Sequence, residues 1–354
     1  MSNKVFFFGA GFSKAINGDY PLLTGKDGLT NRVLRDLKND NGDDYEKKSI
    51  QQHFKEIPQS LTDNIEELLT YLSSDLPWKD ERQKAMNKAL YIDITNKIVK
   101  IFESINNYDF ADCNSKQFQK NKALWEFIYK ENITCVSLNY DLLLEKNLIA
   151  ASNIIKKQDE MIINIQEEDS CGKFYKIPIL NIINRVSNSC SYRYELPEIL
   201  KLHGSINWLY SSISPSDSIF YRDFQKVENN LIEDLVPFII PPILDKNSFY
   251  NNNTLKSIWK RAHTSIKSAE EIYIVGFSFP LTDLPIKLLF QSALRKNNDV
   301  KVYVINPDNS DEFKSRYKHI FTEEQLQWDF CGIDNSLEKF INNKVLNNNL
   351  SEAL

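Results

Sequence analysis

The chain has 354 residues, of which 42% are hydrophobic and 12% aromatic, so it can bury a sizeable core. Its length exceeds the ~250–300 residues at which a single core stops growing, and we expect a sheet domain with a large insertion. The formal net charge of -5 at pH 7 argues against nonspecific nucleic-acid binding as the main task, because such binding needs a basic face. No apolar run approaches the ~20 residues of a membrane span, and the N-terminal run is too short for a signal peptide. We expect a cytoplasmic protein.

The first structural signal is an apolar run that ends in a glycine turn, Lys4-Val-Phe-Phe-Phe-Gly-Ala-Gly-Phe-Ser13. The run predicts a buried strand followed by a helix. Gly9 and Gly11 allow backbone dihedrals that other residues resist, so the amides of the turn can point at an anion. The dinucleotide fingerprint needs G-x-G-x-x-G, and Lys14 replaces its last glycine. A strand-to-helix turn with no ligand would show the same pattern.

Later apolar segments also end in polar or small residues. They end, in chain order, in Asn139 and Asp141, in His203 before Gly204 and Ser205, in Gly276 and Ser278, and in Asn306. In an open parallel sheet, ligands bind in the crevice beyond the carboxyl ends of the strands. The segments therefore predict one crevice where these side chains gather.

The order Gly-Ala-Gly-x-Ser, Asn-x-Asp, His-Gly-Ser, Gly-x-Ser and Ile-Asn resembles the sirtuin family. Three later features, Ile240-Pro-Pro242, Trp259 and Gly276-Phe-Ser-Phe-Pro-Leu-Thr-Asp283, are more similar to the bacterial sirtuin-like proteins of antiphage defence. The resemblance implies an α/β fold with a Rossmann-like parallel sheet of sirtuin type. It also implies NAD+ as the substrate.

The same resemblance implies roles for individual residues. Asn139 and His203 are the expected catalytic residues, Asn139 beside the nicotinamide ribose and His203 as the group that accepts a proton. Read without the resemblance, Asn139 could be a turn or helix cap and His203 a packed residue. The other residues expected to bind NAD+ are Asp141 at the nicotinamide amide, Gly9, Ala10, Gly11, Phe12 and Ser13 at the pyrophosphate, Gly276 and Ser278 at a phosphate or ribose, and Asn306 at the adenosine ribose.

The chain departs from the sirtuin deacylases in two places. The deacylases hold a structural zinc with two Cys-x-x-Cys pairs, a spacing absent from Cys113, Cys135, Cys171, Cys190 and Cys331. Their Gly-Ile-Pro-Asp-Phe-Arg segment is replaced here by Asn17-Gly-Asp-Tyr-Pro-Leu-Leu23, which lacks the arginine. We therefore predict no bound metal, reduced and buried cysteines, and water as the acceptor.

The predicted activity is that of an NAD+ glycohydrolase, which cleaves NAD+ to nicotinamide and ADP-ribose and acts in antiphage defence by NAD+ depletion. A protein deacylase or ADP-ribosyltransferase, or a non-catalytic sensor of NAD+ or ADP-ribose, stays open as an alternative. The resemblance also implies a homo-oligomer, or a partner such as a helicase-like ATPase or an Argonaute-type protein. Because constant NAD+ hydrolysis would be lethal, we expect assembly to control the activity.

Apolar periodicity outlines the domains. Apolar residues recur at helical spacing over Asp63–Ser74 and Arg82–Asn106, and Leu124, Phe127 and Ile128 continue the pattern. We assign residues 1–27 and 126–343 to the Rossmann domain, 28–125 to a helical insertion and 344–354 to a frayed tail. Within the Rossmann domain we expect a variable insertion of loops and edge strands over 150–198, a loop or hairpin over 205–235, and a helix over Leu284–Arg295 capped by Asp283.

Overall fold

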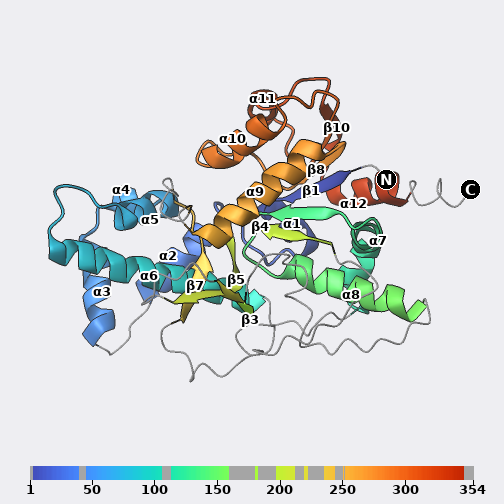
Figure 1. Ribbon diagram of the computed structural model, residues 1–354. Helices are drawn as coiled ribbons and strands as arrows, with labels where there is room; N and C mark the ends of the chain where they lie inside the picture. Colours follow the sequence, from blue (N-terminus) through green and yellow to red (C-terminus); the bar gives the residue numbers. More distant parts are fainter. Residues whose placement is uncertain are drawn as a thin grey trace, which may run out of the picture.

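The computed structural model describes residues 3–39, 45–105, 113–158, 180–181, 197–211, 219–221, 235–243, 250 and 252–346. Figure 1 shows its elements. In chain order they are β1 (Lys4–Phe8), α1 (Ala10–Ile16), α2 (Leu29–Asn39), α3 (Tyr45–Glu56), α4 (Gln59–Thr62), α5 (Ile65–Ser73), α6 (Glu81–Ile105), α7 (Lys116–Lys130), β2 (Thr134–Ser137), α8 (Leu143–Gln158), β3 (Leu180–Asn181), β4 (Ile199–Lys201), β5 (Gly204–Ser211), β6 (Phe220–Tyr221), β7 (Leu235–Ile239), α9 (Asn253–Ser268), β8 (Glu271–Val275), α10 (Leu284–Ala293), β9 (Lys301–Asn306), α11 (Asp311–Lys318), β10 (Leu326–Cys331), α12 (Ser336–Phe340) and the π-helical turn η4 (Ile341–Val345).

The central sheet has the strand order β10-β9-β8-β1-β2-β4, and all of its pairings are parallel. Numbered along the chain among themselves, these strands follow the order 3-2-1-4-5-6 that is typical of dinucleotide-binding Rossmann folds. The order reverses between β1 and β8, and ligands of such sheets bind at that reversal, beyond the carboxyl ends of the strands. The predicted α/β fold with a Rossmann-like parallel sheet is confirmed.

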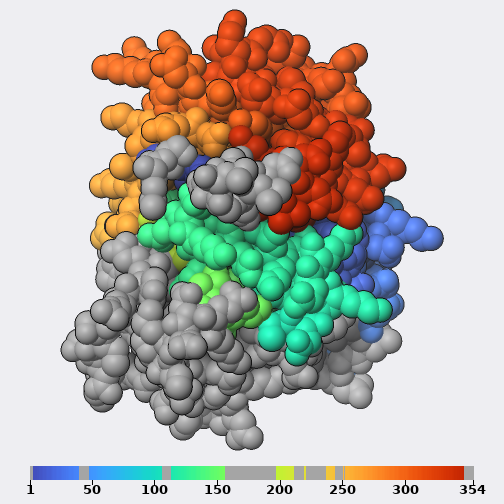
Figure 2. Space-filling model, turned by 90° about the vertical axis from the view of Figure 1, so that its right-hand side faces the viewer, coloured from blue at the N-terminus to red at the C-terminus, as the bar shows by residue number. Residues whose placement is uncertain are grey.

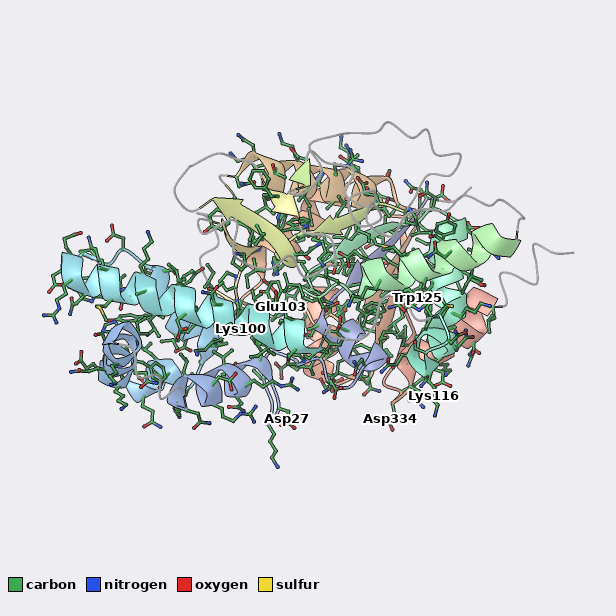
Figure 3. All side chains as sticks on the ribbon, turned by 90° about the horizontal axis from the view of Figure 1, so that it is seen from below. Asp27, Lys100, Glu103, Lys116, Trp125 and Asp334 are labelled. Atoms are coloured by element: carbon green, nitrogen blue, oxygen red, sulfur yellow. The ribbon has the colours of Figure 1, made fainter. Side chains whose placement is uncertain are left out.

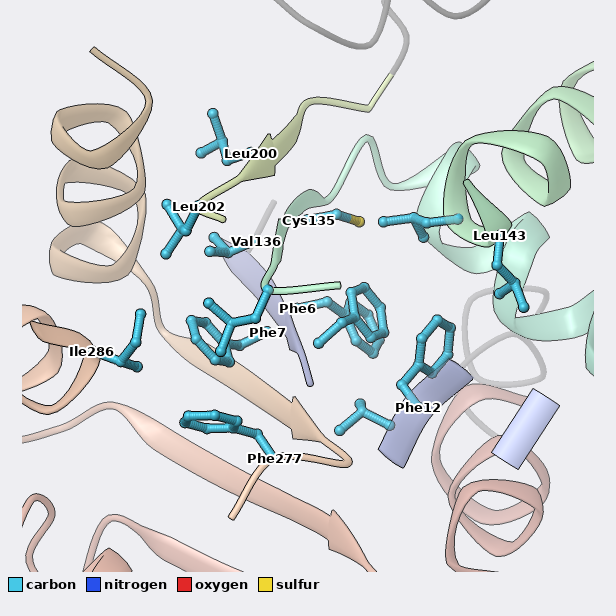
Figure 4. Packing of buried hydrophobic residues seen from close by; sticks show 14 of the residues in the cluster. Phe6, Phe7, Phe12, Cys135, Val136, Leu143, Leu200, Leu202, Phe277 and Ile286 are labelled. Carbon is cyan, nitrogen blue, oxygen red and sulfur yellow. The ribbon is translucent and has the colours of Figure 1, made fainter. Parts of the chain in front are cut away.

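Helices cover both faces of β1, which explains its continuous apolar run. Phe6 stacks on Tyr273 with ring centroids 4.8 Å apart and meets Phe127 of α7 edge-on at 6.4 Å. The next side chain, Phe7, points to the opposite face and packs against Phe290 of α10 at 5.0 Å. Figure 4 shows both phenylalanines at the centre of the buried cluster.

The helices α2 to α6 form the helical insertion, which lies to one side of the sheet in Figure 1. The helices predicted over 63–74 and 82–106 are confirmed as α5 and α6. The long helix α6 contacts α2, α3 and α5, and it also contacts β5 and β7. In Figure 3, Lys100 and Glu103 mark the end of α6 that is nearer the sheet.

The helix α7 packs with the sheet domain, although the sequence assigned its first part to the insertion. It contacts α8 and η4, and its fully buried Trp125 meets Phe12 of α1 with ring centroids 5.9 Å apart. In Figure 2, α7 and the start of α8 (teal to green) form the middle of the face beneath the C-terminal elements (orange to red). The contacts of α7 are thus with elements of the sheet domain, and the boundary of the insertion at residue 125 stays a prediction.

A second, smaller sheet has the order β3-β6-β5-β7. Because β5 pairs antiparallel with β6 and β7, the predicted hairpin over 205–235 is confirmed for the described residues. Within the expected insertion over 150–198, the first residues instead continue α8 to Gln158. One of the edge strands expected within this insertion is present at Leu180–Asn181, and residues 159–179 and 182–196 lie outside the described part of the chain.

The folded chain continues past residue 343, where a tail was expected to begin. Lys344 lies 3.2 Å from the Glu271 carboxylate, and Val345 is fully buried. Both residues belong to η4, and residues 347–354 lie outside the described part of the chain. Within the described ranges, no helix is both long and apolar enough to cross a membrane.

Candidate functional site

The sheet register brings the two expected catalytic residues to one level. Phe8 of β1 pairs with Ser137 of β2, which pairs in turn with Lys201 of β4. Asn139 follows Ser137 by two positions, and His203 follows Lys201 by two positions. Adjacent parallel strands therefore deliver Asn139 and His203 to the same edge of the sheet.

The glycine turns after β1 and β8 interlock at the point where the strand order reverses. The amide of Gly9 donates to Val275 O at 3.0 Å, and the amide of Gly11 donates to Gly276 O at 2.9 Å. Gly276 has a φ of 65°, and a Cβ added there would lie 2.1 Å from the amide nitrogen of Phe12. Only glycine fits this approach, so these residues are required first of all for the packing of the two loops.

The interlocking leaves few amides for a phosphate. The Gly11 amide is used by Gly276, and the Phe12 amide donates to Gly9 O at 2.9 Å. Phe12 points its ring into the core, where it lies 4.2 Å from Phe8. Ala10 is exposed at the first position of α1, so its amide is the donor of this turn that is open to a ligand.

Asn139 is held by a chain of hydrogen bonds that starts at the glycine turn. Its side-chain nitrogen donates to Gly9 O at 3.0 Å and to the Ser13 hydroxyl at 2.9 Å. Ser13, which is 2% exposed, donates in turn to Asp141 Oδ2 at 2.7 Å. An amide nitrogen has two hydrogens, and both are used here. The remaining oxygen, Asn139 Oδ1, is thus available as a hydrogen-bond acceptor.

Asp141 lies behind Asn139, inside the protein. Its Oδ2 accepts from Ser13, and its Oδ1 accepts from the Leu143 amide at 3.0 Å. Burial raises the pKa of the Asp141 carboxyl, whereas the nearby Lys201 ammonium and the Ser13 hydroxyl act in the opposite direction. Direct contact of Asp141 with nicotinamide stays a prediction.

Lys201 and Glu145 form a buried ion pair under this chain. Their side chains are 1% and 0% exposed, and Lys201 Nζ lies 3.2 Å from Glu145 Oε1. The same ammonium donates to the backbone oxygen of Asp141. Sequence reasoning missed both residues. A lysine inside an apolar strand, two residues before His203, was the signal that could have found them.

His203 occupies a turn that is fixed on both sides. It is 7% exposed, and its backbone oxygen accepts from the Ile240 amide at 2.8 Å. Tyr140, next to Asn139, donates its hydroxyl to Ile240 O at 2.6 Å. Burial holds the pKa of this phenol far above its usual value, so it stays protonated. Gly204 has a φ of 77°, and a Cβ there would lie 2.2 Å from Phe238 O.

Asn306 supports the Gly276 loop from the neighbouring strand. Its side-chain nitrogen donates to Phe277 O at 3.3 Å, and its Oδ1 accepts from the Asp308 amide at 3.0 Å. Tyr317 donates its hydroxyl to the same Phe277 oxygen at 2.7 Å. Ser278 is half-buried in this loop. The structure thus brings Asn306 to the loop, and its contact with an adenosine ribose stays a prediction.

The predicted helix over Leu284–Arg295 is present as α10, but the expected cap is wrong. Asp283 occupies the N-cap position, yet its side chain makes no capping hydrogen bond. Its charge instead contributes to the raised pKa values of the Tyr140 and Tyr250 phenols, for both of which burial is the larger cause. The carboxylate of Asp283 therefore acts on the side of the loop that faces Tyr140.

The described cysteines agree only in part with the expectation of buried thiols. Cys135 is buried, whereas Cys113 and Cys331 are partly exposed. Cys171 and Cys190 lie outside the described residues. Among the residues that the structure describes, no cluster of three or more histidine, cysteine or acidic side chains is arranged to hold a metal ion.

Comparison with solved structures identifies Sir2 proteins as similar to this chain. A Sir2 homologue mutant in complex with ADP-ribose has a TM-score of 0.45 and 14% identity, over 100% of this chain and 94% of that one. A Sir2 homologue in complex with NAD has a TM-score of 0.45 and 14% identity, and the match covers 98% of this chain and 91% of that one. A structure from a study of the mechanism and regulation of Sir2 enzymes has a TM-score of 0.44 and 12% identity, and the match covers 100% of this chain and 95% of that one. The chain matches no protein-family model and no curated protein sequence.

Proposed function

We propose that the chain is an NAD+ glycohydrolase that uses water as the acceptor. The observation that carries the proposal is the state of Asn139, whose amide hydrogens are both donated to the protein while Oδ1 is left as an acceptor. His203 stands at the same level on the neighbouring strand. This arrangement suits the binding and orientation of a hydroxyl group or a water molecule.

The proposed reaction needs few side chains. The bond between the ribose C1′ and the nicotinamide nitrogen breaks, and its electron pair neutralises the pyridinium. The leaving group is then neutral, so it needs no general acid, unlike the leaving groups of ordinary glycosidases. A water oxygen forms the new bond to C1′ and loses one proton. The products are nicotinamide, ADP-ribose and that proton.

In the proposal, Asn139 and His203 divide this work. Asn139 Oδ1 accepts a hydrogen bond from the attacking water or from a hydroxyl of the nicotinamide ribose, and so fixes the geometry. His203 accepts the proton, a role for which an imidazole side chain is suited. Gly276, Ser278, the open amide of Ala10 and Asn306 would bind the phosphates and the adenosine ribose.

The segment over residues 17–23 supports water as the acceptor. By resemblance, it replaces the segment that deacylases use at the acyl-lysine. Here Tyr20 is 4% exposed, and its ring lies 6.4 Å from Phe102 of α6. Phe102 in turn meets Tyr140, next to Asn139, at 5.7 Å. The helical insertion thus packs against this segment.

A product assay tests the proposal. The purified chain is incubated with NAD+, and the products are separated by chromatography. Equal amounts of nicotinamide and free ADP-ribose are expected. O-acyl-ADP-ribose in the presence of an acylated peptide, or ADP-ribose attached to protein, would show group transfer instead. Tight NAD+ binding without turnover, with and without candidate partner chains, would show a sensor.

We further propose that the activity serves antiphage defence in the cytoplasm and is controlled by assembly with itself or with a partner. This part rests on the resemblance of residues 240–242 and 276–283 to defence proteins. A phage challenge of cells that carry the wild type or Asn139→Ala tests it. Equal survival of both cultures, with equal NAD+ levels, would contradict it.

A further inference from the structure

We infer that the buried ion pair of Lys201 and Glu145 positions Asn139 for the reaction, acting through Asp141 and Ser13. The inference rests on the proposed function, because the residue that it positions is the one proposed to contact the substrate. Lys201 and Glu145 are positioning residues in this scheme. They lie inside the protein, with side chains that are 1% and 0% exposed.

The location of the pair argues for more than a role in folding. A buried ion pair is a weak source of stability, because taking both charges out of water offsets most of their attraction. This pair lies at the end of β4, where Lys201 Nζ reaches both Glu145 Oε1 at 3.2 Å and the backbone oxygen of Asp141. The ammonium therefore links α8 to the loop that carries Asn139.

The direction of the hydrogen bonds depends on a charged Asp141. A carboxylate only accepts hydrogen bonds, so the Ser13 hydroxyl must donate to it, at 2.7 Å. The Ser13 oxygen is then free to accept from the Asn139 amide, at 2.9 Å. A protonated Asp141 would donate its own hydrogen to Ser13, and the Ser13 hydroxyl hydrogen would then have to turn to another acceptor. The amide of Asn139 would then lose its fixed orientation.

The surroundings of Asp141 show why a buried cation is needed. Asp141 is 3% exposed, and burial favours its neutral form. The groups that face it are the Lys201 ammonium from β4, the Glu145 carboxylate from α8 and the Ser13 hydroxyl from α1. Of these, Lys201 and Ser13 favour the charged form, and Glu145 disfavours it less strongly than Lys201 favours it. Lys201 thereby offsets the cost of keeping Asp141 ionised.

The decisive variant removes both charges at once, as Lys201→Met with Glu145→Gln. Neutralising both partners avoids leaving a single buried charge, so we expect a folded protein with a melting temperature close to that of the wild type. Its kcat for NAD+ cleavage should fall about 10-fold or more, because small misplacements of a catalytic group have large effects. Its KM should change by less than about 3-fold, because the uniform binding of NAD+ is untouched. The acid limb of its kcat profile should move to higher pH.

The matched control is a second ion pair at the other end of the sheet. Lys4 Nζ lies 3.1 Å from Glu131 Oε2, with side chains 11% and 21% exposed. The double variant Lys4→Met with Glu131→Gln should keep the wild-type kcat and pH profile. A wild-type kcat and acid limb in the Lys201 and Glu145 double variant would overturn the inference.

A readout without substrate separates this inference from the proposed function. Hydrogen exchange of the backbone amides over 138–143 should accelerate in the double variant and stay unchanged in the control. If the wild type does not cleave NAD+, the proposed function fails, and the exchange data alone decide whether the pair orders this loop. If the double variant does not fold, Glu145→Gln alone is used. Because Glu145 disfavours the charged form of Asp141, its removal should move the acid limb to lower pH, and an unchanged profile would refute the inference.

Discussion

The side-chain nitrogen of Asn139 lies 2.9 Å from the Ser13 hydroxyl oxygen, although the two residues are 126 positions apart in the chain. The contact joins the turn after β1 to the loop after β2. Ser13 is 2% exposed and its hydroxyl donates to Asp141, so the hydroxyl is engaged within the protein, and its contact with a pyrophosphate stays a prediction. A serine that was expected at the pyrophosphate thus orients the residue proposed to act on the ribose.

Replacing Asn139 by alanine should abolish most of the activity. The variant loses the Oδ1 acceptor, and we expect kcat to fall by at least ~10² without loss of the fold. Steady-state kinetics and a thermal melt measure the two effects. Asn153→Ala, at an exposed position of α8, is the control and should behave as the wild type. Near-normal turnover in folded Asn139→Ala protein would remove Asn139 from the mechanism.

His203 should show the same loss with a different pH dependence. If its imidazole accepts the proton, His203→Gln lowers kcat by about 10²–10⁴ and leaves only the part of the acid limb that Asp141 causes. His263→Gln in α9 is the matched control. A folded His203→Gln enzyme with a near-wild-type kcat and an unchanged acid limb would assign proton transfer to another group.

The glycines at the interlocked turns should be intolerant of any side chain. Gly276→Ala places a Cβ 2.1 Å from the Phe12 nitrogen at a φ of 65°. We expect a loss of about 2–4 kcal/mol in the free energy of unfolding, from the unfavourable backbone conformation and the clash together. Gly18→Ala has nothing within 4 Å of the added Cβ and should be neutral within about 0.5 kcal/mol. Urea unfolding distinguishes the two.

The core strands and the long helices follow from local patterns in the sequence. The run over Val5–Phe8 is continuous because both faces of β1 are covered, and α6 shows a buried apolar stripe from Leu90 to Ile105. Apolar periodicity reports which residues are buried, and it needs no knowledge of their partners. For this reason the fold class was predictable.

The side-chain contacts within the site were not predictable in the same way. The pairing of Lys201 with Glu145 depends on a contact between β4 and α8 that no local pattern specifies. Gly276 was expected at a phosphate, whereas its first requirement is the close approach of Gly11. Asp283 has the residue type of a helix cap, but its side chain does not cap α10. Residue type and position suggested more than one role for each of these residues. Which contacts each residue makes could be learned only from the three-dimensional structure.

The helix α6 offers a test of control by assembly. Lys88 is exposed on it, and Ile92 is 43% exposed. If a closed state restrains the site, about 2.7 kcal/mol suffices to hold the open form near 1%. The double variant Lys88→Glu with Ile92→Asp should change the oligomer size in light scattering or the partner-dependent activity. Lys267→Glu on α9 should not. Full activity of the monomeric wild type, unchanged by these substitutions, would exclude this form of control.

Asp141→Asn should separate stability from activity. Because burial raises the pKa of Asp141 in the folded protein, the folded state holds this proton more tightly than the unfolded state does. The stability that the proton provides is fully present below the ordinary aspartate pKa of about 4 and is lost as pH rises through the folded pKa. Asparagine is neutral throughout. The melting temperature of Asp141→Asn relative to the wild type should therefore become more favourable as pH rises above about 4.

The activity of the same variant should move in the other direction. The new amide nitrogen donates to Ser13, whose hydroxyl loses the carboxylate that orients it, so kcat should fall by about 10² with little change in KM. Steady-state kinetics at pH 7 and thermal melts across the pH series are both measured on Asp141→Asn and on the wild type. A relative melting temperature that declines with rising pH would show that Asp141 is stabilised as a carboxylate by more than its burial costs. The charged and polar groups around Asp141 would then suffice to keep it ionised and to keep the hydrogen bonds running from Asn139 through Ser13 to Asp141. The kcat of Asp141→Asn would still show whether the direction of these hydrogen bonds affects the reaction.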